Sequence, residues 1–238
     1  MVTSFSLGDI EVDVVLKDIK NIHLSVYPPD GRVRVAAPSR MNLDTIRVFT
    51  ISKLDWIRKH QRKLREQERE TQREYLERES HFLWGKRYLM KVVEHDAGPR
   101  VELSHQHLQL FIRPNTGEAR RQEVIEGWYR GQLKAVAESL IRRWERRLEV
   151  KVERFFVQRM KTRWGSCNPA SRTIRLNTDL AKKPKNCLEY IVLHELAHLI
   201  EPTHNPRFVE IMDHFMPKWR SYREQLNRLP VSHEEWRY

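Results

Sequence analysis

The sequence predicts an α+β fold, because stretches with the two-residue period of strands alternate with stretches that have the helical period. In residues 5–16 and 20–27, β-branched residues alternate with polar ones, as they do in half-buried strands. Residues 118–148 carry apolar residues every three or four positions, which predicts one long helix. Residues 185–200 are apolar around most of the helical circumference, which indicates a buried helix.

The N-terminal residues read as a small antiparallel sheet followed by a helix. The turn residues at 28–31 separate 20–27 from a further alternating run. Asn42 or Asp44 is placed to cap a helix. Beyond Gln61 that helix becomes almost entirely charged. We therefore expect one long helix, about residues 42–79, that projects into solvent or contacts a partner.

A second β-rich stretch follows, with strand patterns at 82–93, 101–103 and 108–112 and a turn at Trp84-Gly85. We assign residues 1–115 to an antiparallel, β-rich N-terminal region with long helices. Residues 116–238 form the second domain, in which 152–160 and 172–177 are the expected strands. Further helices are expected at 206–216 and 219–229.

The composition favours contact with polyanions or acidic substrates and argues against several other classes. The 238 residues carry a net charge of +12, so nucleotides and nucleic acid are possible partners. Much of this charge alternates with glutamate, which is typical of a solvated helix face. No apolar run is long enough to span a membrane. Cys167 and Cys187 are the two cysteines, and the first residues lack a signal-peptide pattern, so we expect a cytoplasmic protein without disulfides.

The strongest functional signal is a His-Glu-x-x-His motif in the apolar helix, formed by His194, Glu195 and His198. Residues four apart on a helix lie about 40° apart on one face, so the two imidazoles can bind one zinc ion. Glu195 lies about 100° round from His194, where it can act as general base without binding the metal. Burying such side chains without partners would cost several kcal/mol, which strengthens the prediction of a metal site.

His204 is the expected third ligand. Pro202 is suited to ending the helix, and Asn205 and Pro206 have the residue types of a helix N-cap and first helical position. This turn would bring His204 back to the metal. Three protein ligands and one open position are the arrangement of a catalytic zinc site, with one ion per chain. Water there would ionise near neutral pH, and Glu195 would take its proton and pass it to the leaving group.

Other side chains could change this ligand set. Glu210 and Asp213 lie on the following helix, and either carboxylate is an alternative to His204 as the third ligand. A fourth ligand from Cys167 would instead make the zinc structural.

Residues 163–167, Arg-Trp-Gly-Ser-Cys, form a second candidate element. Gly165 allows close backbone approach, so an extended substrate could pair its backbone with a strand edge here. Lys161 and Arg163 could stabilise an oxyanion or hold a phosphate. The alternative is a tight bulged turn with basic side chains in solvent. The candidate substrate-binding residues are Lys161, Arg163, Trp164, Gly165 and Ser166.

Three segments together resemble the YgjP-like metallopeptidase family: MKTRWGSC at 160–167, TIRLN at 173–177 and EYIVLHELAHLIEPTHNPRF at 189–208. The specific signal covers about residues 159–229, and the N-terminal half matches more loosely. Glu201 stands where the metzincin motif has glycine, which argues against a true metzincin.

The resemblance implies a zincin-like catalytic core, similar to that of the SprT-like and WLM zinc proteases. Such a core has a small sheet, an active-site helix and a third histidine opening the next helix. It implies zinc ligands at His194, His198 and His204 and the general base at Glu195.

These observations favour a zinc-dependent hydrolase, in the first place a metallopeptidase that acts on a peptide or protein. One alternative is a metal-dependent hydrolase of nucleotide phosphoanhydrides, with the basic side chains near Arg163 holding phosphate. Another is a nucleic-acid-associated protein in which zinc is mainly structural. A salt-dependent affinity for nucleic acid would distinguish the last class.

Overall fold

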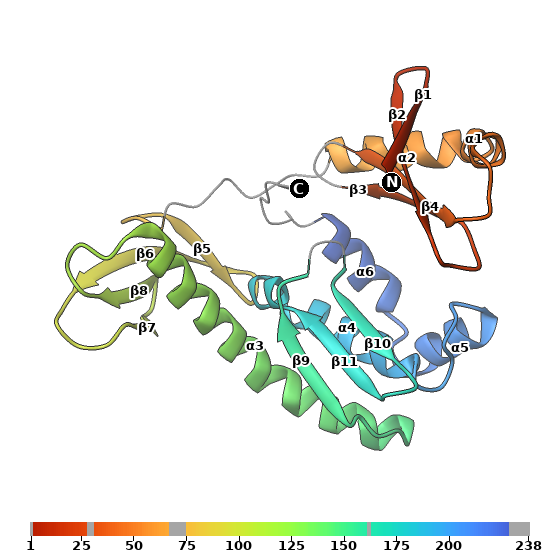
Figure 1. The fold of residues 1–238 in the computed structure, drawn as a ribbon. Helices are drawn as coiled ribbons and strands as arrows, with labels where there is room; N and C mark the ends of the chain where they lie inside the picture. The colour runs from red at the N-terminus through yellow and green to blue at the C-terminus, as the bar shows by residue number, and fades with distance from the viewer. Residues whose placement is uncertain (1, 28–30, 67–74, 161–162, 229–238) are drawn as a thin grey trace. The chain divides into compact units, whose positions relative to one another are not determined.

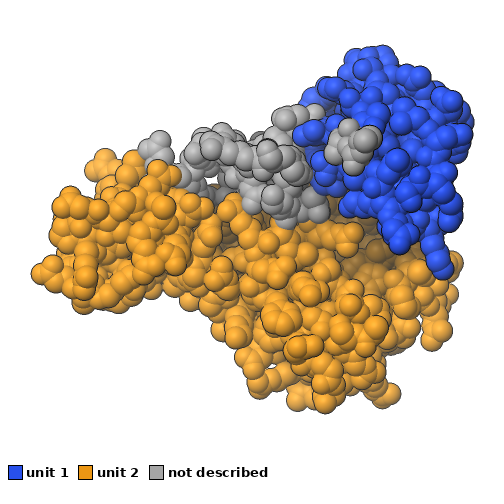
Figure 2. Space-filling view, viewed as in Figure 1, with its two compact units in different colours: residues 1–70, 230–238 blue, residues 71–229 orange. Residues whose placement is uncertain are grey.

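The computed structural model describes residues 2–27, 31–66, 75–160 and 163–228 (Figure 1). The chain divides into two compact units, whose described parts end at residue 66 and begin at residue 75 (Figure 2). Each unit has its own hydrophobic core. The predicted α+β class is confirmed, because the described residues form helices and three small sheets. The second β-rich stretch belongs to the C-terminal unit, whereas the sequence grouped it with the N-terminal region.

The first unit contains a four-stranded sheet in the order β1-β2-β4-β3. Its strands are β1 (Val2–Leu7), β2 (Ile10–Lys17), β3 (His23–Tyr27) and β4 (Arg32–Pro38). Gly8 has a φ of 64° and allows the tight turn between β1 and β2. The expected antiparallel unit is corrected to a mixed sheet, because β2 and β4 run parallel. Alternating residues identify a strand but do not show which strand pairs with it. In the structure, β4 lies between β2 and β3.

Two helices follow, α1 (Leu43–Ile51) and α2 (Leu54–Glu66). Asn42 is the N-cap of α1, and its side chain accepts a 2.8 Å hydrogen bond from the Thr45 N–H. Of the two caps that the sequence suggests, Asn42 and Asp44, the structure therefore uses Asn42. In α2, the Gln61 side-chain amide donates to the Gly31 carbonyl oxygen at 2.8 Å. The start of the charged stretch is therefore in contact with the residue that directly precedes β4 of the same unit.

The expectation of one continuous helix over about 42–79 is wrong, because the described residues depart from a helix at two places. The helix is interrupted between α1 and α2, and residues 75–79 are not helical. The Arg78 N–H donates to the Met90 carbonyl oxygen, and the Met90 N–H donates to the Glu79 carbonyl oxygen, at 2.9 and 2.8 Å. These residues therefore pair with a strand, which hydrophobic periodicity does not reveal. Residues 67–74 lie outside the described residues.

The second unit begins with a mixed sheet in the order β5-β6-β8-β7. Its strands are β5 (Ser80–Leu83), β6 (Lys86–Glu94), β7 (Arg100–Leu103) and β8 (His107–Ile112). Trp84 and Gly85 form the predicted turn, with φ values of 52° and 79°. Positive φ at both central residues matches the right-handed twist of the two strands.

Helix α3 (Glu118–Leu148) has the bounds predicted from its periodicity. It packs against β7 and β8 near its start and against β9 and α4 further along, so it joins the two sheets of the second unit (Figure 1). Its exposed face carries ion pairs one turn apart, such as Arg120–Glu123, as expected for a solvated face. Among the described helices, none is long and apolar enough to cross a membrane.

The remaining elements surround helix α4. They are β9 (Arg154–Gln158), β10 (Gly165–Asn168), β11 (Thr173–Asn177), the 3-10 helix η1 (Thr178–Lys182), α4 (Lys185–Ala197), α5 (Pro206–Phe215) and α6 (Trp219–Arg228). The sheet order is β10-β11-β9, with β9 parallel and β10 antiparallel to β11. Helix α4 packs on β10 and β11 and also touches α3, α5 and α6. Helix α4 is therefore enclosed on several sides.

Candidate active site

Helix α4 carries His194, Glu195 and His198 at its C-terminal end. Its apolar side chains are buried all round, and Leu193 before the motif and Leu196 within it are both fully buried. The helix ends at Ala197, and His198 is the C-cap residue. The Nδ1 atom of His198 lies 3.1 Å from the Glu201 carbonyl oxygen. A hydrogen bond to that carbonyl requires a proton on Nδ1, which leaves the Nε2 lone pair of His198 available as a ligand.

The chain turns after Glu201 and returns at His204, as the sequence predicts. Asn205 is the N-cap of α5, and its side chain accepts a 3.0 Å hydrogen bond from the Phe208 N–H. Pro206 occupies the first turn of that helix. The Nε2 atoms of His204 and His194 lie 3.1 Å apart. The cap therefore fixes the start of α5 at the residue that follows His204.

The three histidines form a group that could hold a metal ion. One ring nitrogen from each of His194, His198 and His204 lies within 4.8 Å of the others. Ligands at about 2.0–2.1 Å around a tetrahedral zinc are roughly 3.4 Å apart, which is close to the 3.1 Å between the two Nε2 atoms. Of the alternative ligands, Glu210 is exposed and Asp213 accepts a 2.7 Å bond from the Trp219 indole N–H. Neither these carboxylates nor Cys167 join the group in the part of the chain that is described.

The electrostatics of His194 favour a neutral imidazole. Burial lowers the pKa of His194 to about 3, and the nearby His198, His204 and Arg223 act in the same direction. The buried Nδ1 atom of His194 has no hydrogen-bond partner among the described residues. Burial also lowers the pKa of His198, against the raising effect of its bond to the Glu201 carbonyl. Neutral imidazoles with converging lone pairs are the donor set that zinc prefers, so these residues fit a metal ion.

The ring of Phe208 contacts all three imidazoles from helix α5. Its centroid lies 5.0, 4.7 and 4.8 Å from the ring centroids of His194, His198 and His204. The Phe208 side chain is 2% exposed, so its own position is fixed by the core. Phe208 therefore restricts the orientation of each histidine ring.

Glu195 is a buried carboxyl beside this group. Only 5% of the residue is exposed. Burial raises the pKa of Glu195 to about 8, while the positive charge of Arg163 opposes that increase. A carboxyl with a raised pKa next to a cation is typical of a group that exchanges protons.

Strand β10 lies next to Glu195 and is an edge strand among the described residues. The Asn177 N–H donates to the Trp164 carbonyl oxygen at 2.9 Å, and hydrogen-bonded pairs alternate along an antiparallel ladder. The backbone N–H and carbonyl groups of Gly165 and Cys167 therefore point away from β11, toward the free edge. Residues 165–167 thus belong to an edge strand, which corrects the bulged turn of the alternative, whereas Arg163 just before the strand is exposed, as that alternative expected.

The other candidate substrate-binding residues have different surroundings. Arg163 is exposed and Ser166 is half-buried. Trp164 packs against the core, and the Lys183 ammonium lies 5.9 Å from its ring centroid. Lys161 lies outside the described residues.

A family model described as the YgjP-like metallopeptidase domain matches residues 20–229. The chain belongs to the YgjP-like family. A comparison with curated proteins finds no match.

Two solved structures are similar to part of this YgjP-like chain. The metallopeptidase zymogen abylysin of Pyrococcus abyssi is 20% identical, with a TM-score of 0.36, over 40% of this chain and 99% of its own. The metallopeptidase zymogen jannalysin of Methanocaldococcus jannaschii is 19% identical, with a TM-score of 0.35, over 38% of this chain and 92% of its own.

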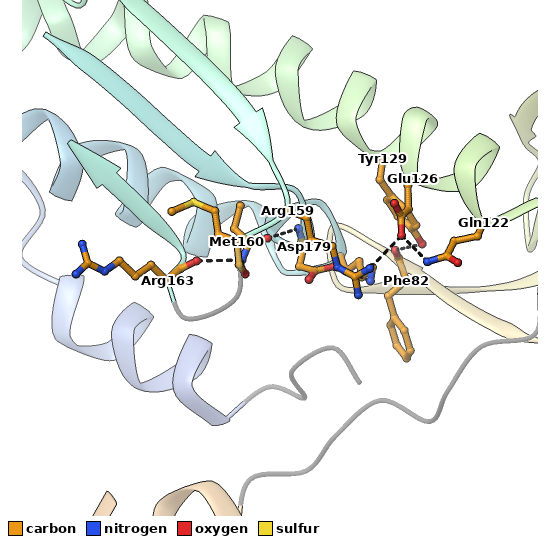
Figure 3. A network of polar contacts seen from close by, with 10 residues as sticks. Phe82, Gln122, Glu126, Tyr129, Arg159, Met160, Arg163 and Asp179 are labelled. Carbon is orange, nitrogen blue, oxygen red and sulfur yellow. Dashed lines mark hydrogen bonds and ion pairs between the residues drawn. The ribbon is translucent and has the colours of Figure 1, made fainter. Parts of the chain in front are cut away.

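Sequence reasoning missed two residues that shape the site of this YgjP-like protein. The sequence places Phe208 only within the predicted helix at 206–216. The sequence places Asn177 only in a strand. In the structure its side-chain amide donates, at 2.7 and 2.9 Å, to the carbonyl oxygens of Met160 and Arg163, which Figure 3 labels. An asparagine at the end of a predicted strand was the available signal, because an amide that becomes buried there needs partners.

Proposed function

We propose that this chain is a zinc-dependent peptidase in which His194, His198 and His204 bind the metal and Glu195 is the general base. The observation that carries the proposal is the convergence of the three imidazoles beside a buried carboxyl and a strand edge. Membership of a metallopeptidase family supports the same reaction class.

The donor set favours zinc over magnesium or calcium. Imidazole nitrogens suit zinc, whereas the other two ions prefer oxygen ligands. When bound, zinc supplies Lewis acidity, which lowers the pKa of water toward about 7. Three protein ligands leave a position open to water, as in catalytic sites.

Glu195 moves the proton. Its carboxylate takes a proton from the attacking water and delivers it to the nitrogen of the departing amine. The positive charge of Arg163 favours the ionised form that the first of these transfers requires. Burial keeps the carboxyl away from bulk water, so its proton passes to the substrate.

The edge of β10 favours an extended peptide as substrate. The outward N–H and carbonyl groups of Gly165 and Cys167 can pair with a peptide backbone, which adds a strand to the sheet. A nucleotide has no matching alternation of donors and acceptors. Arg163, at the entry to this edge, can stabilise the oxyanion that forms when the peptide carbonyl is attacked.

The proposal is tested by metal analysis and by activity on labelled casein. We expect one zinc per chain, and a strong loss of zinc in His204→Ala. Glu195→Gln should keep the zinc and lose at least about a hundredfold in casein cleavage, which is within the usual effect of a general base. Casein cleavage that survives in Glu195→Gln would refute the role of Glu195. Hydrolysis of nucleoside triphosphates without casein cleavage would support the phosphoanhydride alternative.

A further inference from the structure

Gly165 is the residue of β10 that faces Glu195. If a Cβ atom were added to Gly165, it would lie 2.6 Å from Oε1, 2.9 Å from Cγ and 3.0 Å from Cδ of Glu195. Nonbonded carbon and oxygen atoms do not approach so closely without strain. The Glu195 side chain therefore fills the space that a side chain at position 165 would take.

The backbone conformation does not explain a glycine at this position. The positive-φ glycines are Gly8, Gly31 and Gly85, so Gly165 has a backbone that other residues can adopt. On helix α3, by contrast, an added Cβ at Gly127 or Gly131 would meet nothing within 4 Å. What Gly165 provides is space for the carboxyl group.

Neither partner in this contact can move easily. Glu195 lies on a buried helix and is itself 5% exposed, so its side chain has little room to turn aside. The start of β10 is fixed by Asn177, whose main-chain N–H donates to the Trp164 carbonyl oxygen. The Asn177 side-chain amide donates to the carbonyl oxygens of Met160 and Arg163, both of which are labelled in Figure 3. A side chain at position 165 would therefore displace the carboxyl or the strand edge.

We infer that Gly165 is a positioning residue: its missing side chain lets the Glu195 carboxyl rest directly against the strand edge that would bind the substrate. The carboxyl then sits at a fixed place relative to a peptide paired with the backbone of Gly165. This inference rests on the proposed role of Glu195 as general base, but the contact itself is testable without any activity.

The first test is a double-mutant cycle on thermal stability, with the full chain and zinc present. Gly165→Ala should lower the melting temperature by about 2–10 °C, the range expected for an overpacked core site in a protein of this size. In a Glu195→Ala background, the same change should have almost no effect, because the atoms that clash are gone. Gly131→Ala is the matched control, and it should leave the melting temperature equal or higher.

The second test separates positioning from a general structural defect. Zinc content of Gly165→Ala should stay at one per chain, while kcat on labelled casein falls at least tenfold and KM changes less than threefold. Gly131→Ala should keep wild-type values for all three.

The outcomes distinguish the two ideas. An equal loss of melting temperature in both backgrounds overturns the inference about Gly165, whatever Glu195 does. A rise in KM with unchanged kcat would overturn it as well, since a displaced general base affects the chemical step. Full activity of Glu195→Gln would instead remove the proposed function, while a non-additive cycle would still establish the contact.

Discussion

Replacing Phe208 with alanine should weaken zinc binding, because this ring holds the three histidines in place. Its centroid is 4.7–5.0 Å from each imidazole centroid, and aromatic pairs contribute about 0.5–1.5 kcal/mol each beyond buried area. Taking the lower value for three pairs gives about 1.5 kcal/mol, which corresponds to a Kd for zinc about ten times higher. The buried ring also contributes to folding, and its removal should destabilise the protein by about 3–5 kcal/mol.

The assay is a competition titration of zinc against a chromophoric chelator, at a temperature where circular dichroism shows every variant folded. Phe208→Leu keeps most of the apolar volume and should show a smaller increase in Kd. Phe215→Ala is the matched control, since this ring lies on the same helix but packs on Trp144, with a centroid distance of 6.3 Å. An unchanged Kd in folded Phe208→Ala, or an equal increase in Phe215→Ala, would refute the reasoning.

Three further predictions concern the supports of the site and the metal itself. Asn205→Ala removes the cap of α5 and should destabilise the protein by about 1 kcal/mol in urea denaturation. It should also raise the Kd for zinc, because His204 directly precedes the cap. An unchanged free energy of unfolding and an unchanged Kd would contradict this prediction. Asn177→Ala removes two side-chain hydrogen bonds and should lower the free energy of unfolding by about 2–3 kcal/mol. Asn177→Asp lacks the same donors, so a wild-type urea midpoint for it would argue against their importance. Removing zinc should destabilise the wild type by about 2.7 kcal/mol relative to a hundredfold excess of free zinc over its Kd. Calorimetry should show no such change in His204→Ala.

The sequence alone determined the elements whose signals are local. The bounds of α3 followed from its apolar period, and the start of α5 followed from Asn205 and Pro206. The candidate metal group followed from the spacing of three histidines on a helix and the turn after it. Each of these depends on residues close together in the chain, whose geometry a helix or a cap fixes.

The tertiary structure alone decided which elements are neighbours. Periodicity did not show that β2 and β4 run parallel or that the second β-rich stretch packs with the C-terminal unit. Nor did it show that Phe208 contacts the histidines, or that Gly165 makes room for Glu195, 30 residues further along the chain. Such contacts depend on how whole elements pack against one another. The sequence pattern around a residue is the same whichever element that residue contacts, so the pattern cannot identify the contact. The candidate metal ligands could therefore be predicted from the chain, while the position of the Glu195 carboxyl against the strand edge came from the packing.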